Sequence, residues 1–206
     1  MVPESELNQP EALLGDFRTA MSQLAAGVVM VTCHVGDKPW GLTVSACCSV
    51  SMSPPLILVS LGAGTTSVRA IEECGAFGVS LLSQALIDVA RFGSAPGQPK
   101  FVEDYCRSEP HASSSPAVAG ALAHVDCLLE STVPAGDHVL FIGRVRCVVL
   151  SEESEHAPLV YHSRKYHQLV AAADRPAETL GEETVDSLLY DYPVPRQFAR
   201  CVALGA

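Results

Sequence analysis

The sequence predicts a mainly β protein, in which an antiparallel β-barrel carries helices on its outside. Runs rich in apolar and β-branched residues recur between turn residues, which is typical of short strands. Helical stretches are inserted between these runs without the strict alternation that a parallel sheet requires. Two long strand-like runs, 121–132 and 138–150, follow one another across the short turn 134–137. Together these observations favour an antiparallel barrel over a parallel sheet.

The first predicted element is a helix over residues 11–25, because its apolar side chains recur at intervals of three and four residues. Gly27 ends this helix, and residues 28–33 are predicted as a strand rich in β-branched side chains. The turn Gly36-Asp37 leads back into a strand over 40–44. We therefore expect the first two strands to form a hairpin.

Strands and short helices then follow one another. A strand over 56–61, a helix over 67–73 and a strand over 77–82 are predicted in turn. Ser83 is expected to cap a helix that runs to Phe92. Residues 93–116 are rich in Pro, Ser and Gly and are predicted as a loop. After the two long strands, the short strands 159–161 and 165–167 close the regular part of the chain.

The predicted domain boundaries divide the chain into three parts. Residues 1–10 form an N-terminal tail and residues 11–170 form one domain, a length that can bury a real core. Residues 171–206 form an acidic C-terminal tail, for which three alternatives stay open. It packs on a second subunit, folds over the functional site, or remains disordered.

The composition excludes several classes of protein. A formal net charge of −10 argues against nucleic acid or an anionic membrane as the main partner. The first residues are polar and acidic, unlike a secretory signal, and no apolar run is long enough to span a bilayer. Most of the eight cysteines lie in apolar runs, where a thiol packs as a small hydrophobic group. We therefore predict a cytoplasmic protein with reduced cysteines.

Short motifs indicate an anion site but no protein nucleophile. Gly62-Ala63-Gly64 lies between a strand and a helix, where backbone N–H groups can bind an anion. It does not match the dinucleotide fingerprint, because Ser67 occupies the third glycine position. No spacing of His, Cys or carboxylate residues predicts a metal site. Cys47 and Cys48 are adjacent in an extended stretch, so they should point to opposite faces and pack as small side chains.

An ordered set of motifs from about residue 14 to about residue 169 resembles the flavin reductase family of FMN-binding split-barrel proteins. The motifs that carry this resemblance are Gly41-x-Thr43, Ser49-Val50-Ser51-x-x-Pro54-Pro55, Phe77-x-Val79-Ser80, Lys100-Phe101, Gly136-Asp137-His138-x-x-x-x-Gly143 and Pro158-Leu159-x-Tyr161. Two departures stand out. Ser45-Ala46 follows the threonine where relatives often show two polar residues, and Cys47-Cys48 precedes the Ser-Val-Ser run.

The resemblance implies a six-stranded antiparallel split barrel that forms a homodimer with flavin near the subunit interface. It implies oxidation of NADH or NADPH, with FAD or FMN as the flavin, and delivery of the reduced flavin to a partner monooxygenase. His138 would lie beside the nicotinamide and act in catalysis. The residues implied to contact the cofactors are Thr43, Val44, Ser45, Ser49, Val50, Ser51, Pro55, Gly64, Ser67, Phe101, His138 and Tyr166.

Two other functions stay open at this point. The first is a split-barrel flavoprotein that holds its flavin tightly and acts directly on a small substrate. The second is an inactive flavin-binding or interaction protein that works through its acidic tail. Flavin that co-purifies without NAD(P)H oxidation would favour the first, and a lack of both flavin binding and nicotinamide turnover would favour the second.

Overall fold

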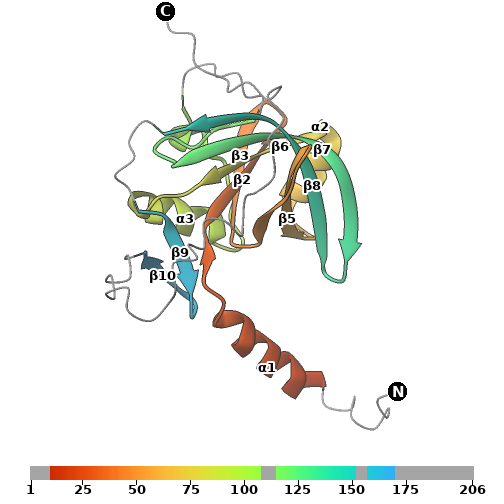
Figure 1. Ribbon diagram of the computed structural model, residues 1–206, viewed down its shortest axis with the longest axis vertical. Helices are drawn as coiled ribbons and strands as arrows, with labels where there is room; N and C mark the ends of the chain where they lie inside the picture. Colours follow the sequence, from red (N-terminus) through yellow and green to blue (C-terminus); the bar gives the residue numbers. More distant parts are fainter. Residues whose placement is uncertain (1–9, 108–114, 152–156, 170–206) are drawn as a thin grey trace, which may run out of the picture.

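A seven-stranded antiparallel sheet forms the centre of the computed structural model, which describes residues 10–107, 115–151 and 157–169 (Figure 1). The strand order is β3-β2-β6-β7-β8-β5-β4. The strands are β2 (Val29–Val35), β3 (Lys38–Val44), β4 (Cys47–Met52), β5 (Pro55–Gly62), β6 (Ala76–Leu81), β7 (Ala123–Ala135) and β8 (His138–Leu150). A second, three-stranded sheet has the order β1-β9-β10, formed by β1 (Ala26–Gly27), β9 (Leu159–His162) and β10 (Lys165–Gln168).

Helices cover the large sheet and extend from it. They are α1 (Pro10–Ser22), α2 (Thr66–Cys74) and α3 (Ile87–Ser94), with short 3-10 turns η2 (Gln84–Leu86) and η3 (Glu103–Tyr105). Figure 1 shows α1 projecting away from the sheets, and its apolar side chains Leu13, Leu14, Phe17 and Met21 are exposed. Among the described residues, no helix is both long and apolar enough to cross a membrane.

The core lies on both faces of β2, which explains its almost uninterrupted apolar sequence. Val29, Val31 and Cys33 pack in one cluster together with residues of α2, β5 and β8. Val28 and Met30, which alternate with them, pack in a second cluster with residues of α3 and β9. Since successive side chains of a strand point to opposite faces, the two clusters lie on opposite sides of the sheet.

The two edges of the large sheet are joined by a very short connection. Only residues 45 and 46 separate the end of β3 from the start of β4, although these strands are the two edges of the sheet. Three residue steps span at most about 11 Å, so the sheet must curl until its edges approach one another. The edges are close without being paired as strands, and Ala46 C=O accepts a hydrogen bond from Ser60 N–H on β5 at 3.0 Å.

The predicted mainly β antiparallel fold is confirmed, and most elements lie within a few residues of their predicted positions. The large sheet has seven strands instead of six, because residues 47–52 pair with β5 as an additional strand. The first helix ends at Ser22, and residues 26–27 pair with β9. The predicted terminal tails, 1–10 and 171–206, lie outside the described residues apart from Pro10, the first residue of α1.

Ser83 does not cap the following helix through its side chain. Its hydroxyl donates instead to the Gly120 carbonyl at 3.4 Å, and η2 precedes α3. The vicinal cysteines behave as predicted on β4, since Cys47 is half-buried and Cys48 is exposed. Cys33, Cys47, Cys48, Cys74, Cys106 and Cys127 are free thiols, and burial raises the pKa of Cys33 and of Cys127 to about 12. At neutral pH these two thiols are therefore protonated and pack as apolar groups.

Candidate functional site

The turn that follows β5 lies directly beside the turn of the β7–β8 hairpin. Gly62, the last residue of β5, is paired with His138, the first residue of β8. The Ala63 N–H group donates to the Asp137 carbonyl at 2.9 Å, and Thr65 N–H donates to the Gly62 carbonyl at 3.0 Å. The register of β5 and β8 therefore fixes His138 next to the 62–65 turn.

Helix α2 begins immediately after this turn, and its N-terminus has no side-chain cap. Thr65 has the extended backbone of an N-cap residue, but its hydroxyl makes no capping hydrogen bond. Thr65 Oγ1 is buried, and no hydrogen-bond partner for it exists among the described residues. A buried hydroxyl without a partner is unfavourable, by about 1–3 kcal/mol. This hydroxyl is therefore available to a ligand that binds at the start of α2.

A cleft of about 580 Å³ opens at the same helix end. Three segments line it: the end of β3, the start of α2 with its preceding turn, and the loop that follows α3. The lining residues are Trp40, Leu42, Gly64, Thr65, Thr66, Ser67, Gly97, Gln98, Pro99, Lys100 and Phe101. The cleft thus brings together Gly64, Ser67 and Phe101 of the residues that the sequence predicted.

Trp40 holds two of these three residues in position. Its Nε1–H donates to Ser67 Oγ at 3.2 Å, and both side chains are buried. Its ring meets Phe101 edge to face, with ring centroids 5.1 Å apart. Lys38 Nζ lies 5.5 Å from the centroid of the Phe101 ring, a cation–π arrangement. The result is an aromatic pair beside the start of α2, an arrangement that suits a planar heterocycle that carries a phosphate.

Lys100 supplies a positive charge at the cleft. Its Nζ donates to the Ala95 carbonyl, and its own carbonyl accepts from Gly41 N–H at 3.0 Å. Partial burial lowers the pKa of Lys100 by disfavouring the charged form. An anion in the cleft would favour that charged form, so the residue fits an anionic ligand.

Thr43 and Tyr166 lie on a second part of the site, connected to the cleft through the end of α3. Thr43 Oγ1 is also buried and has no partner among the described residues. Gly93 faces it so closely that a Cβ atom there would overlap Thr43 Oγ1 and lie 3.1 Å from Thr43 N. The next residue, Ser94, has its Oγ 3.4 Å from the Tyr166 hydroxyl. Residues 95–100 then lead directly into the cleft.

The remaining predicted residues follow the two edges of the curled sheet. Val44 is half-buried at the end of β3, and Ser45 is exposed beside it. On β4, Ser49 and Val50 are exposed and Ser51 is half-buried, around a β-bulge between Ser49 and Ser51.

Not every predicted residue is close to His138. Pro55 lies seven positions before Gly62 on β5, about 23 Å along an extended strand. Within one chain, the Ser51 and Pro55 end of the strands is therefore separate from His138. The roles of all these residues remain predictions.

His138 has an acidic neighbour on the same turn. Its Nδ1 is 2.7 Å from Asp137 Oδ1, and its side chain is 47% exposed. The hydrogen bond and charge of His138 lower the pKa of Asp137. Asp137 therefore stays ionised at neutral pH and orients the His138 ring.

Two functional candidates were missed by the sequence reasoning, namely Trp40 and Thr65. Trp40 is the single tryptophan of the chain, and Thr65 lies inside the predicted anion-binding turn. Each could have been noticed from these features of the sequence. The role of Trp40, however, depends on its contact with Ser67, and that of Thr65 depends on its burial, and a sequence displays neither.

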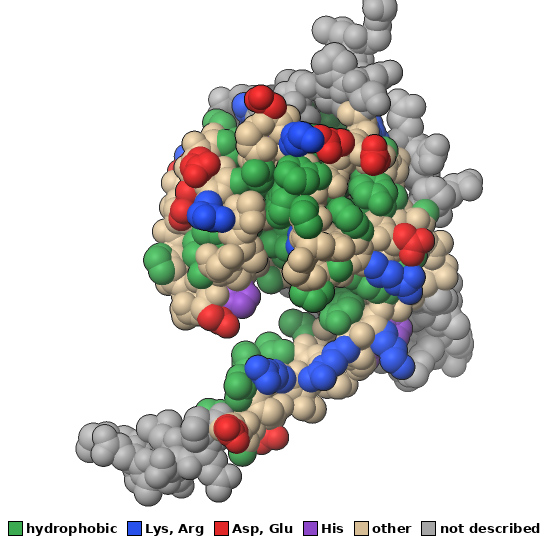
Figure 2. All heavy atoms as spheres, turned by 180° about the vertical axis from the view of Figure 1, so that it is seen from behind, with side chains coloured by type: hydrophobic (Ala, Val, Ile, Leu, Met, Phe, Trp, Pro, Cys, Tyr) green, Lys and Arg blue, Asp and Glu red, His purple; other side chains and the backbone are tan. Residues whose placement is uncertain are grey.

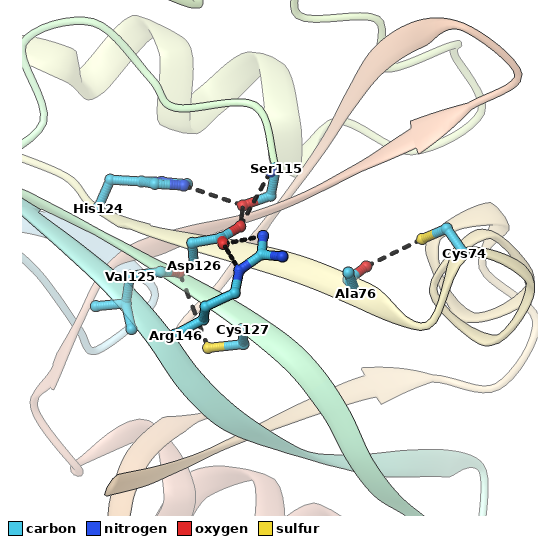
Figure 3. Close-up of polar contacts among 8 residues, drawn as sticks. All are labelled: Cys74, Ala76, Ser115, His124, Val125, Asp126, Cys127 and Arg146. Carbon is cyan, nitrogen blue, oxygen red and sulfur yellow. Dashed lines mark hydrogen bonds and ion pairs between the residues drawn. The ribbon is translucent and has the colours of Figure 1, made fainter. Parts of the chain in front are cut away.

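A second polar cluster is buried on β6, β7 and β8 and shares no residue with the cleft (Figure 3). Ser115 Oγ–H donates to Asp126 Oδ1 at 2.5 Å, and Arg146 Nε donates to Asp126 Oδ2 at 2.8 Å. His124 lies between two serines, with Nε2 3.1 Å from Ser115 Oγ and Nδ1 2.9 Å from Ser80 Oγ. Because the Ser115 proton is directed to Asp126, its oxygen accepts from Nε2–H, and Nδ1 accepts from Ser80. These hydrogen bonds connect neighbouring strands of the sheet, which fits a structural role.

The fold and the cleft define the class: an antiparallel β protein with a cleft at the start of α2. The chain belongs to the flavin reductase like domain family, whose model matches residues 21–170. The predicted family is confirmed.

Three relatives show how far the similarity extends. The actinorhodin polyketide dimerase of Streptomyces coelicolor is 37% identical, over 77% of this chain and 88% of that protein. The reductase component of 4-hydroxyphenylacetate 3-monooxygenase from Thermus thermophilus is 35% identical, over 75% of this chain and 95% of that protein. The NADH:FAD oxidoreductase SgcE6 of Streptomyces globisporus, solved in complex with NAD and FAD fragments, is 25% identical with a TM-score of 0.70 and covers 78% of this chain and 95% of its own.

The residues present fit a flavin. Its phosphate requires N–H donors and a cation, which the start of α2 and Lys100 offer. Its polar groups would satisfy the buried hydroxyls of Thr65 and Thr43, which have no partner among the described residues. The aromatic pair of Trp40 and Phe101 provides apolar surface for a planar ring.

Proposed function

We propose that this protein is an NADH-dependent flavin reductase that supplies reduced FAD or FMN to a separate monooxygenase. The observation that carries the proposal is the cleft at the uncapped start of α2, with the buried Thr65 hydroxyl at its wall. The relatives named as an NADH:FAD oxidoreductase and as a monooxygenase reductase component support it. NADPH as an alternative donor belongs to the same proposal.

The chain's own residues bind, orient and shield the reactants. The α2 N-terminus and Lys100 would hold the phosphate, and Trp40 fixes Ser67 beside it. A bound flavin would supply the acceptor for a hydride from the nicotinamide, so these residues need provide no protein nucleophile. Asp137 would orient His138, which would lie at the nicotinamide side of the site. There His138 would help to hold the nicotinamide against the flavin ring.

The direct test measures oxidation of NADH and of NADPH by ligand-free protein with added FMN, FAD or riboflavin. We expect turnover with NADH and with at least one phosphorylated flavin, and weaker turnover with riboflavin, which lacks the phosphate. Flavin that remains bound while neither nicotinamide is oxidised would contradict the proposal and favour a flavoprotein that acts directly on a small substrate.

Replacing Thr65 by valine is expected to weaken flavin binding by up to about tenfold, since one neutral hydrogen bond contributes about 0.5–1.5 kcal/mol. The folded state should lose nothing, because the Thr65 hydroxyl has no partner among the described residues. Titration with FMN, followed through the fluorescence of the single tryptophan Trp40, measures the affinity. Thr132→Val, an exposed threonine on β7, is the matched control. Equal FMN affinities of Thr65→Val and Thr132→Val would show that the Thr65 hydroxyl does not contribute to flavin binding.

Replacing His138 by alanine is expected to impair NADH-dependent flavin reduction by roughly 10–100-fold while leaving flavin affinity largely intact. The reason is that His138 lies at the β5–β8 end of the site, opposite Gly62, and not among the residues that line the cleft. Stopped-flow reduction of bound flavin measures the effect. If the variant reduced flavin as fast as the parent with both NADH and NADPH, His138 would have no role in the reaction.

We also propose that the protein is a cytoplasmic homodimer. The exposed apolar side chains of α1, which projects from the sheets, support a second copy as its cover (Figure 1). The buried thiols of Cys33 and Cys127 suit a reducing compartment. Light scattering that returned only the 21.7 kDa mass of one chain would contradict the homodimer.

A further inference from the structure

A basic surface lies where the end of α1 meets the β9–β10 hairpin; we define it by Arg18, Arg164 and Lys165. Ser163 N–H in the hairpin turn donates to the Ser22 carbonyl at the end of α1, at 2.7 Å. Arg18 lies one helical turn before Ser22. Figure 2 shows Lys and Arg side chains, in blue, running from α1 toward this hairpin beside a histidine. Positive charge is thus gathered here, in a chain whose net charge is −10.

The hairpin turn is held in an uncommon conformation that presents this charge. Ser163 and Arg164 have φ values of 48° and 62°, in the left-handed region that favours glycine or asparagine. Arg164 and Lys165 are exposed at the tip of the hairpin. Within the described ranges, no carboxylate pairs with any cation of the basic surface, whereas Lys38, Arg91, Arg144 and Arg146 each have an acidic partner.

The C-terminal part of the sequence carries the complementary charge. The family match ends at residue 170, so residues 171–206 are an addition to the matched domain. Residues 176–195 contain no Lys or Arg, and they contain the five carboxylates Glu178, Glu182, Glu183, Asp186 and Asp191. Three of these, at 178, 182 and 186, are spaced by four residues, so negative charge recurs along the segment.

The connection is long enough for this acidic segment to return to the basic surface. β10 ends at Gln168, three residues after Lys165. The eight residues 170–177 span up to about 27 Å when extended, more than the roughly 10 Å of strand between Gln168 and Lys165. Glu178 and the residues after it can therefore reach Lys165 and Arg164 within the same chain.

We propose that the acidic segment 178–191 docks on the basic surface of its own chain. The contact would be electrostatic and therefore weakened by salt.

Zero-length carbodiimide crosslinking of the full chain tests the docking, because the chain has only three lysines, Lys38, Lys100 and Lys165. At about 20 mM salt, where screening is weak, we expect Lys165 to be joined to a carboxylate of 178–191. Lys38, which lies 3.5 Å from Glu103, should be joined to Glu103 as the internal positive control. The Lys165 crosslink should fall at least fivefold at about 500 mM salt and in Arg18→Glu/Arg164→Glu.

A matched control and a labelling experiment define the outcomes that would overturn the docking. Arg69→Glu/Arg91→Glu changes the net charge equally at exposed positions on α2 and α3 and should leave the Lys165 crosslink unchanged. Absence of the crosslink in the parent chain, or its equal loss in this control, would overturn the proposal. In a 1:1 mixture of labelled and unlabelled chains, crosslinks between the two masses would show that the occupant is the tail of a second copy, which also overturns it.

Discussion

Replacing Arg146 by methionine is expected to destabilise the domain by about 3–5 kcal/mol, because it removes the ion pair between Arg146 and the buried Asp126 carboxylate. The Asp126 side chain is completely buried, and Arg146 donates to it through two nitrogens. Methionine keeps most of the arginine's apolar length, so the loss reports on charge and not on packing. Urea unfolding followed by circular dichroism measures the change.

Arg144→Met is the matched control for this experiment. Arg144 lies on the same strand and forms a bidentate pair with Glu130 on β7, but both side chains are exposed. We expect its unfolding midpoint to stay close to that of the parent, since water replaces the lost partner. If Arg146→Met and Arg144→Met lost similar amounts of stability, the burial of Asp126 would not determine the loss.

Asp126 also makes the stability of the parent chain depend on pH. Burial disfavours its charged form, but hydrogen bonds from Ser115 and the ion pair with Arg146 outweigh this and lower the pKa of Asp126. Since the folded pKa lies below the unfolded value of about 3.9, the ionised carboxylate stabilises the fold above that value. This contribution is lost as the pH falls through the unfolded value toward the folded pKa, so the unfolding midpoint should decline below about pH 4 to 5.

Replacing Gly93 by alanine is expected to destabilise the domain by about 1–3 kcal/mol and to weaken flavin binding at least tenfold. The added Cβ would overlap Thr43 Oγ1 and lie 2.7 Å from Met30 Cε, so α3 must move away from β3. That movement displaces Thr43, whose buried hydroxyl we assign to the cofactor, and it also shifts Ser94 beside Tyr166. Thermal unfolding and an FMN titration measure the two effects.

Gly15→Ala controls for the general effect of adding a methyl group to a helix. A Cβ at Gly15 of α1 meets no atom within 4 Å, so we expect a neutral or slightly stabilising change of up to about 1 kcal/mol. If Gly93→Ala bound FMN as tightly as Gly15→Ala, the close approach of α3 to Thr43 would not matter for the cofactor.

The sequence predicted the fold class well because the strands carry strong local signals. β2 and β8 are rich in apolar residues and are bounded by turn residues, and the positive φ of Gly36 and Gly136 fits the turns predicted there. β4 was not predicted as a strand of the sheet, since most of its residues are exposed and it pairs with β5 around a bulge. The expectation that Ser83 caps a helix failed because the Gly120 carbonyl lies within reach of its hydroxyl, and a local pattern does not reveal that contact.

The candidate site could be predicted only in part, for the same reason. Gly64, Ser67 and Phe101 were found through short motifs, and the structure places all three at one cleft. Trp40 was missed although it bonds Ser67 and packs on Phe101, because residues 40, 67 and 101 are distant in the chain.

By itself the sequence therefore determined the class of fold and the family and predicted an anion-binding turn, since apolar periodicity, turn residues and ordered motifs can be recognised along the chain. Only the tertiary structure decided which residues meet. It placed His138 opposite Gly62, left the hydroxyls of Thr43 and Thr65 buried without a partner among the described residues, and brought Arg18 to the hairpin of Arg164 and Lys165. The physical reason is that burial and pairing depend on strand register and on the curl of the sheet, which arise when distant segments pack together.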